Sequence, residues 1–214
     1  MNTNPRHIGR YTLQEPLGRD SMTEVWKAID TQHNRYVAIK LFHPQLQTDP
    51  DFVNRFFSEM QRIASLHHPN IVQIHDFQVS QPPESENSTF YMVMDYVEGQ
   101  TLADYIRHTS RLGRFAPTAE IIRLLLPVGA AIDYAHQRGI LHLDIKPTNI
   151  LLGKAAHSNT PIPMLTGFGI VQLLRTPDRS PSSAFYISPE RAQGYVGNER
   201  SDLYSLGMIL YEML

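Results

Sequence analysis

The sequence has no cysteine, so disulfide bonds, thiolate metal sites and a cysteine nucleophile are excluded. The same absence fits a reducing compartment, and we expect a cytoplasmic location. An excess of charge is also lacking, because the formal net charge is only −2. A nearly neutral chain presents no basic field for nucleic acid or for an anionic membrane, so neither partner is expected.

A long uninterrupted hydrophobic run is missing as well. The most apolar stretch, "IIRLLLPVGAAI", contains Arg123 and Pro127 and is too short to span a bilayer. The first residues, "MNTNPRHIGRYTLQ", lack an apolar signal-peptide core, so no secretory signal is expected. With 214 residues, of which 42% are hydrophobic, the chain can fill the core of one large domain or of two small lobes.

The first half of the chain is typical of strands. Short β-rich segments are broken by Gly, Asp and Asn, and one helix with apolar residues at helical spacing interrupts them. The polar segment "QVSQPPESENS" is interpreted as a mobile hairpin loop. The expected strands are 11–18, 23–30, 35–42, 71–77 and 89–97, and the expected helix is 51–66.

The second half is typical of helices. Thr101 is placed to cap the helix that follows it. A longer helix is predicted to start near Pro117 and to stop at Gly139. It should kink at Pro127, because an interior proline costs roughly 3 kcal/mol unless the helix bends. Strands followed by helices indicate an α+β chain in two lobes, hinged at 95–99.

Nine short segments occur in a fixed order: "LGRDSMTEV", "VAIK", a helix with Glu59, "HPNIV", "VMDYVEG", "HLDIKPTN", "GFG", "SPE" and "SDLYSLG". Together they resemble the protein kinase family, especially bacterial serine/threonine kinases of eukaryotic type. The resemblance runs from about Tyr11 to the last residue. It implies a two-lobed kinase fold. The N-lobe would span 1–97, with a five-stranded sheet, one helix and a flexible tail at 1–10, and a mainly helical C-lobe would span 98–214.

The last segment, "SDLYSLGMILYEML", resembles the start of the central helix of a kinase C-lobe. The family continues with further helices, so we expect a C-terminally truncated C-lobe, as a fragment or as an abridged gene product. In the family pattern, Glu190 of "SPE" pairs with an arginine from that further part. We therefore expect its carboxylate to be unpaired, which is costly for a partly buried charge.

The resemblance assigns a lysine and a glutamate of the first lobe to nucleotide binding. Lys40 shares a strand face with the small Ala38, where a flat ligand could approach and the lysine could neutralise phosphate oxygens. The alternative is a solvated strand lysine. Glu59 lies on the apolar face of the expected helix and would hold Lys40 against the phosphates. The alternative is a surface pair with Arg55, worth only ~0.3–0.5 kcal/mol.

Seven residues would surround the adenine ring by the same resemblance, with ordinary core packing as the alternative for each side chain. Four would form apolar walls, one would lie at the back of the pocket, and two would bind the purine edge through backbone groups. In that order they are Leu17, Val25, Ala38 and Leu151; Met94; Asp95 and Val97.

The segment "HLDIKPTN" carries the most specific chemical pattern. The family pattern implies that Asp144 accepts or orients the proton of the substrate hydroxyl and that Lys146 balances charge on the transferred phosphoryl group. Asn149 would bind a magnesium ion through its carbonyl oxygen. The alternative is a polar turn whose shape is set by Pro147.

The sequence departs from the family pattern in its phosphate loop. Gly18 is kept, but Asp20 and Thr23 stand in place of two further glycines. Glycine lets a backbone approach phosphates closely. We therefore expect Asp20 to weaken ATP binding, unless its carboxylate points away or meets a metal.

A second departure precedes the catalytic aspartate. Leu143 stands where many family members have an arginine that receives an activation-loop phosphate. Leucine cannot bind a phosphate, so phosphorylation of the loop over 170–190 lacks this receptor. The loop contains Thr176, Ser180, Ser182 and Ser183, and a structural role is expected for the last.

A third departure concerns the metal. In "TGFG", Gly167 occupies the position of the main magnesium-binding aspartate of the family. Magnesium near ATP is usually held by one or two carboxylates, and Asn149 is the only recognised ligand left. The loss should slow phosphoryl transfer by roughly a thousandfold or more. Phe168 remains, so the apolar packing beneath the helix of Glu59 can still form.

These observations favour a serine/threonine protein kinase-like domain that is a pseudokinase, with weak ATP binding and with Mg²⁺ binding in doubt. It would act as a regulatory binding module toward an unidentified protein partner or substrate. The alternative is a weakly active kinase with a non-standard metal site, for instance through Asp20. A third interpretation is a degraded fragment without a function of its own.

Overall fold

The computed structural model describes residues 6–20, 23–43, 51–80, 89–155, 158–169 and 181–214. It divides into two compact units. Unit 1 consists of Met1–Ser65 and Gln73–Tyr96, and unit 2 consists of Leu66–Val72 and Val97–Leu214. Most of the expected hairpin loop, 81–88, lies outside the described residues.

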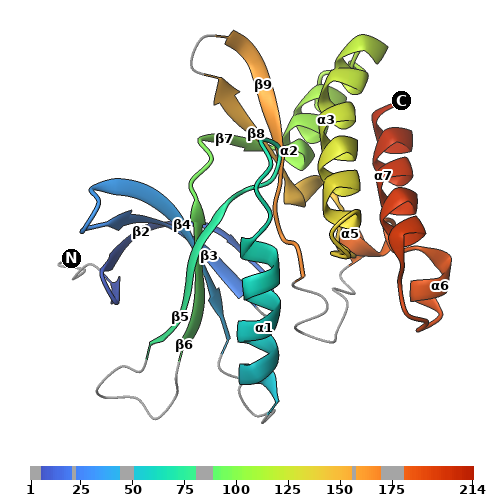
Figure 1. Ribbon diagram of the computed structural model, residues 1–214. Coiled ribbons are helices and arrows are strands. Elements are labelled where there is room, and N and C mark those ends of the chain that lie inside the picture. Colours follow the sequence, from blue (N-terminus) through green and yellow to red (C-terminus); the bar gives the residue numbers. More distant parts are fainter. Residues whose placement is uncertain (1–5, 21–22, 44–50, 81–88, 156–157, 170–180) are drawn as a thin grey trace. The chain divides into compact units, whose positions relative to one another are not determined.

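An antiparallel sheet of six strands forms most of unit 1 (Figure 1). Its strand order is β1-β2-β3-β4-β6-β5. The five predicted strands and the predicted helix are confirmed, with β5 starting three residues later than expected. Their bounds are β1 His7–Ile8, β2 Tyr11–Arg19, β3 Thr23–Asp30, β4 Arg35–Phe42, β5 Ile74–Ser80, β6 Thr89–Asp95 and α1 Phe52–Ala64.

The sheet has one strand more than the sequence predicted. β1 was expected to belong to a flexible tail, yet His7 and Ile8 pair with Thr12 and Tyr11 of β2. Gly9 between the two strands has φ +53°, which glycine adopts at little cost, so the chain can reverse within two residues. This part of the expected tail is therefore ordered as an edge strand.

The alternation along β4 decides which face of the sheet is buried. Val37, Ile39 and Leu41 point to one side and are at most 3% exposed. They pack with apolar residues of the neighbouring strands into one hydrophobic core. The members of this core are Ile8, Tyr11, Leu13, Ala28, Val37, Ile39, Leu41, Tyr91 and Val93.

Helix α1 presents an aromatic face to the sheet. Phe52 and Phe56 recur at helical spacing and are fully buried. The ring of Phe56 meets Phe42 and Phe90 edge to face, with centroids 5.3 Å and 5.2 Å away. Among the described residues, no side chain caps the N-terminus of α1. Packing of the aromatic face is therefore the main stabilising contribution for this helix.

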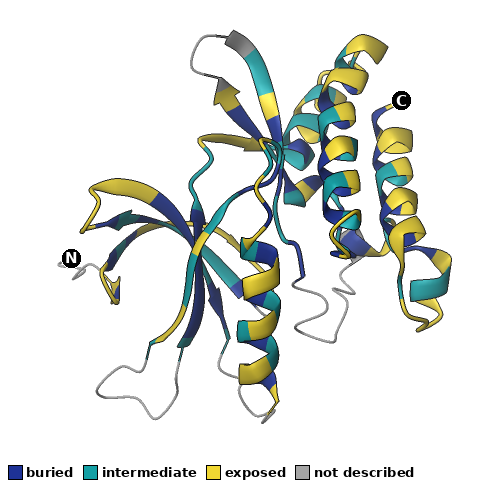
Figure 2. Ribbon diagram, viewed as in Figure 1, coloured by how far each residue is buried: buried dark blue, intermediate teal, exposed yellow. Residues whose placement is uncertain are grey.

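Unit 2 combines a small antiparallel sheet, in the order β7-β8-β9, with several helices. Helices α3 and α7 lie side by side, and buried and exposed residues alternate along both (Figures 1 and 2). The bounds are β7 Gly99–Thr101, α2 Leu102–Arg111, α3 Thr118–His136, η2 Pro147–Asn149, β8 Ile150–Ala155, β9 Ser158–Leu165, α5 Pro181–Ala184, α6 Pro189–Ala192 and α7 Glu199–Met213.

The predicted cap of α2 is confirmed. The hydroxyl of Thr101 accepts a hydrogen bond from the Asp104 N–H (3.0 Å), and the Asp104 carboxylate accepts one from the Thr101 N–H (3.3 Å). This reciprocal capping box satisfies two donors that the helix start would leave unpaired. The helix therefore begins directly at the end of β7.

Helix α3 continues through Pro127 without a break. Pro127 has no N–H to donate to the carbonyl of Arg123, four residues earlier. Because Arg123 is exposed, water can donate to that carbonyl instead. The helix ends near Gly139, whose φ is +67°. Across the described residues, no helix has the length and apolar character needed to cross a membrane.

The segment Leu66–Val72 belongs to unit 2 because it lies along β9. Ile71 forms a parallel bridge with Leu165. The Val72 N–H donates to the Leu165 carbonyl (2.9 Å), and the Leu165 N–H donates to the Asn70 carbonyl (2.8 Å). These bonds hold the strand that leads into the "TGFG" segment.

Candidate active site

The predicted catalytic loop in unit 2 is held by a buried carboxylate on α7. Asp202 is 0% exposed and accepts hydrogen bonds from the N–H groups of His142 (2.9 Å) and Leu143 (2.7 Å). His136 Nε2 lies 2.8 Å from the same carboxylate. A buried charge is tolerated only when it is well paired, and these three contacts meet that need.

The histidine of the loop is wholly buried and neutral. His142 Nε2 donates to the Thr166 carbonyl (3.0 Å), and its Nδ1 accepts from the Asp144 N–H (3.2 Å). Burial lowers the pKa of His142, which agrees with this neutral arrangement. Its ring packs against Phe168 with centroids 4.4 Å apart. The histidine thus joins the loop to the "TGFG" segment.

The three predicted catalytic residues lie together in one loop. Lys146 Nζ lies 3.1 Å from Asp144 Oδ1 and 3.2 Å from Ser183 Oγ. Asn149 Nδ2 donates to the Asp144 carbonyl (2.7 Å) and to Asp144 Oδ2 (2.8 Å). Both carboxylate oxygens of Asp144 therefore accept contacts from within the loop.

Gly167 faces this loop with no side chain. Its φ is +94°, and a Cβ built on it would lie 3.2 Å from Asn149 Nδ2 and 3.6 Å from Asn149 Oδ1. A carboxylate at this position would therefore lie beside Asn149. With glycine there, the neutral amide of Asn149 is the one ligand of the family pattern that is present, so the residues do not match the magnesium site of that pattern.

No group of three or more His, Cys, Asp or Glu side chains suited to a metal ion occurs within the described part of the chain. Of the four hydroxyl residues singled out in the activation loop, the structure describes the side chain of Ser183. Thr176 and Ser180 lie outside the described residues, as does the side chain of Ser182. Ser183 is buried and accepts the hydrogen bond from Lys146.

In unit 1, Asp20 turns its carboxylate toward Thr23. Asp20 Oδ1 accepts from the Thr23 N–H (2.7 Å) and Oδ2 accepts from the Thr23 hydroxyl (2.8 Å). The Asp20 N–H donates to the Thr23 carbonyl (2.9 Å). Asp20 and Thr23 are thereby bonded to each other, and both oxygens of this carboxylate are engaged by Thr23.

Several predicted nucleotide residues share one face of the unit 1 sheet. Val25 lies directly opposite Lys40, and Ala38 lies directly opposite Met94. Directly opposed residues point to the same face, and Ala38 and Lys40 are two residues apart on one strand. Leu17, on β2, is 46% exposed. The pairing of the strands therefore places Val25, Lys40, Ala38 and Met94 on the same face of the sheet.

The remaining adenine-site residues divide between the units. In unit 1, the Asp95 N–H donates to the Gln73 carbonyl (3.0 Å). In unit 2, Leu151 pairs with Thr101 and Met164 in the small sheet. Val97 lies close against Gly153, since a Cβ there would come 2.9 Å from Val97 Cγ1.

Glu59 contacts an arginine of its own helix. Its Oε2 lies 3.1 Å from Arg62 Nη1, three residues later, rather than pairing with Arg55 as the alternative had it. Its Oε1 is buried and has no hydrogen-bond partner among the described residues. The predicted pair of Glu59 with Lys40 stays a prediction.

The sequence matches the protein kinase domain family over residues 11–214. It is 39% identical over 220 residues to the serine/threonine-protein kinase PknB of Mycolicibacterium smegmatis, covering 99% of this chain and 33% of that protein. It is 36% identical over 219 residues to the serine/threonine-protein kinase PrkC of Bacillus subtilis, covering 100% and 32%. The crystal structure of the Mycobacterium tuberculosis PknI kinase domain is similar at a TM-score of 0.76 and 28% identity, covering 100% of this chain and 77% of that one.

The chain belongs to the protein kinase family. It has the two-lobed kinase fold that the motifs implied, and it is a serine/threonine protein kinase-like domain. It spans about a third of the length of these two curated relatives.

One expectation for the kinase segment "SPE" is wrong. Glu190 was expected to be unpaired, but its Oε1 accepts hydrogen bonds from the hydroxyls of Ser188 (2.6 Å) and Ser201. The bond from Ser188, and then that from Ser201, holds the pKa of Glu190 below its usual value. Two serine hydroxyls therefore satisfy this carboxylate within unit 2.

Sequence reasoning missed two residues that hold the kinase catalytic loop. Asp202 was present in the quoted "SDLYSLG" segment, where it is the one acid, but no role was assigned to it. Arg191 donates a hydrogen bond to the carbonyl of Leu143, and no pattern in the sequence indicated this contact.

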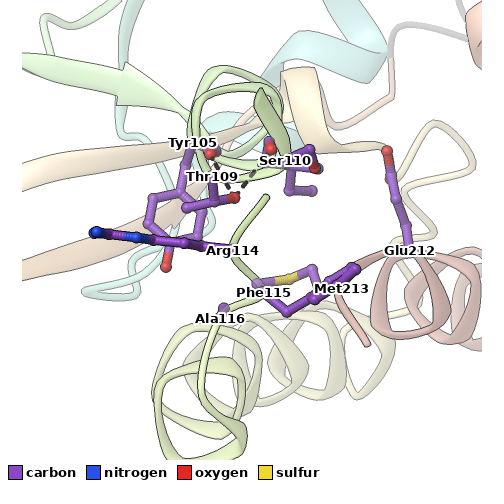
Figure 3. A pocket seen from close by; sticks show the side chains of 9 residues that line it. Tyr105, Thr109, Ser110, Arg114, Phe115, Ala116, Glu212 and Met213 are labelled. Atoms are coloured by element: carbon purple, nitrogen blue, oxygen red, sulfur yellow. Dashed lines mark hydrogen bonds between the residues drawn. The ribbon is translucent and has the colours of Figure 1, made fainter. Parts of the chain in front are cut away.

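Unit 2 also has a shallow groove (Figure 3). It is formed by the second half of α2, the connection to α3 and the end of α7. None of its lining residues belongs to the predicted kinase site. They are Tyr105, Ile106, Thr109, Ser110, Arg114, Phe115, Ala116, Glu212 and Met213.

Proposed function

We propose that this kinase-like domain is a pseudokinase that binds nucleotide weakly and signals through contact with a protein partner. Gly167 carries the proposal, because it faces Asn149 where the family pattern has a carboxylate. A neutral amide oxygen alone is a poor site for Mg²⁺, which is usually held by carboxylates and phosphate oxygens. The loss of that interaction would lower the transfer rate by roughly a thousandfold or more.

We propose that nucleotide binding survives through residues that need no metal. Lys40 would neutralise phosphate oxygens, and the buried Oε1 of Glu59 would be the acceptor that steadies it. Apolar side chains would enclose the adenine ring, with the backbone of Asp95 and Val97 on its polar edge. The proposed enclosing side chains are Leu17, Val25, Ala38, Met94 and Leu151.

A second candidate function is a weakly active serine/threonine kinase. The complete set of Asp144, Lys146 and Asn149 favours it. Metal recruitment through Asp20 is disfavoured, because both of its carboxylate oxygens accept hydrogen bonds from Thr23. An active enzyme would therefore need to open the Asp20–Thr23 turn or to find its metal ligands elsewhere.

Phosphate transfer from radiolabelled ATP to a general serine/threonine substrate protein separates the two candidates. We expect the wild type to match the Asp144→Ala background, far below the roughly one transfer per second of slow active kinases. A wild-type rate near that value, abolished by Asp144→Ala, would establish the weak kinase instead. Loss of such a rate in Asp20→Asn as well would identify Asp20 as its metal ligand.

A further inference from the structure

The residue directly before Asp144 is held in an unfavourable backbone conformation. Leu143 has φ +61°, in the left-handed region that residues with a Cβ rarely adopt. Its side chain is buried, 8% exposed. A strained residue persists only where its surroundings determine it, so the contacts around Leu143 must supply that constraint.

Both backbone polar groups of Leu143 are held by charged side chains. Its N–H donates to Asp202 Oδ1 (2.7 Å), and its carbonyl accepts from Arg191 Nη1. Hydrogen bonds to charged groups are stronger than those between neutral groups. We call Asp202 and Arg191, together with Gly197 beside them, the Leu143 clamp.

Gly197 provides the space in which the Leu143 clamp is packed. A Cβ built on Gly197 would lie 2.7 Å from Leu143 Cδ2 and 2.8 Å from Arg191 Cδ. Real Cβ atoms do not approach other atoms so closely, so only glycine fits without a shift of one of the two side chains. The stem of Arg191 is therefore packed against Gly197, next to the Leu143 side chain.

The guanidinium of Arg191 also lies in the field of three carboxylates. Burial lowers the pKa of Arg191, while the charges of Asp144, Asp202 and Glu190 oppose that effect. Arg191 is therefore a partly buried cation with acids around it.

We propose that Arg191 is the positioning residue for Asp144: by holding the Leu143 carbonyl, it fixes the left-handed residue that sets the direction of the catalytic carboxylate. The family pattern has a cation at position 143 that receives a phosphate. Here the cation is Arg191 of α6, and it binds the backbone carbonyl of Leu143. The arrangement of the loop is therefore built in and does not depend on phosphorylation of the activation segment. The proposal concerns the loop itself and does not require turnover.

Amide hydrogen exchange of the full chain tests the clamp. We expect Arg191→Met, which keeps the stem but loses the donor, to raise the exchange rates of the His142, Leu143 and Asp144 amides by about tenfold, the effect of one lost hydrogen bond. Arg191→Lys keeps a donor and should stay within about threefold of wild type. Arg200→Met, at an exposed position of α7, is the control and should change none of these rates.

If Arg191→Met does not fold, two glycine-to-alanine variants test the proposal independently. Gly197→Ala should raise exchange at the same three amides, whereas Gly207→Ala, where a Cβ meets nothing within 4 Å, should not. The proposal is overturned if Arg191→Lys exchanges as fast as Arg191→Met, or if the Gly197→Ala rates equal wild type. It is also overturned if the β8 and β9 amides accelerate to the same extent, because the effect would then be general loosening of unit 2.

Discussion

The catalytic loop and the "TGFG" segment lie in the same unit, but only one of them has its full set of side chains. In the loop, Asp144, Lys146 and Asn149 contact one another, and Asp202 holds the backbone before them. In the neighbouring segment, Gly167 offers only backbone beside Asn149. The comparison shows that the shape of the loop rests on Asp202, His142 and Arg191 and does not need a carboxylate at Gly167. Shape and metal chemistry are therefore encoded by different residues.

The largest expected effect comes from removing the support of the intact loop. Asp202→Ala leaves the N–H groups of His142 and Leu143 and the ring of His136 without their acceptor in a buried place. We expect the free energy of unfolding to fall by about 3–5 kcal/mol. Chemical denaturation followed by circular dichroism measures this loss.

The matched control for that change is Asp133→Ala. The side chain of Asp133 is exposed and accepts one hydrogen bond from Gln137, directly after the same helix (2.7 Å). Its removal should cost no more than about 0.5 kcal/mol. Equal losses in the two variants would mean that the loop is held by something other than Asp202.

A smaller effect is expected from acid, again on the intact loop. Because burial lowers the pKa of His142 below its unfolded value of 6.5, the unfolded chain takes up a proton there before the folded chain does. Stability from the neutral ring is therefore complete above pH 6.5 and is lost as the pH falls below it, by at most about 1.4 kcal/mol per pH unit. Denaturation midpoints of wild type and His142→Asn between pH 7.5 and 5 check this. Identical slopes for the two proteins would contradict it.

Much of unit 1 could be predicted from the sequence, because its signals are local. Short β-rich segments predicted the strands, and apolar residues at helical spacing, Phe52 and Phe56 among them, predicted α1. The edge strand at His7–Ile8 was missed, since two residues are too short for a periodic pattern. It exists because of the turn at Gly9.

The candidate site was only partly predictable, because several of its contacts join residues far apart in the sequence. The motif placed Asp144, Lys146 and Asn149 in one loop. It could not reveal that Arg191 contacts Leu143 from 48 positions away, or that the hydroxyl of Ser201 satisfies Glu190. Such long-range contacts depend on how the helices pack and leave no pattern in a single sequence.

The central claim, that Gly167 is what separates kinase shape from metal chemistry, is tested most directly by the magnesium dependence of ATP binding. Gly167→Asp and Gly167→Ala both place a Cβ at φ +94°, which costs about 1–2 kcal/mol of stability, and only the first adds a carboxylate. Calorimetric titration with ATP, with and without Mg²⁺, should show affinities that hardly respond to the ion in wild type and Gly167→Ala. In Gly167→Asp, Mg²⁺ should tighten ATP binding by about tenfold or more. A similar tightening in wild type or in Gly167→Ala would contradict the account, because another group would then be holding the metal.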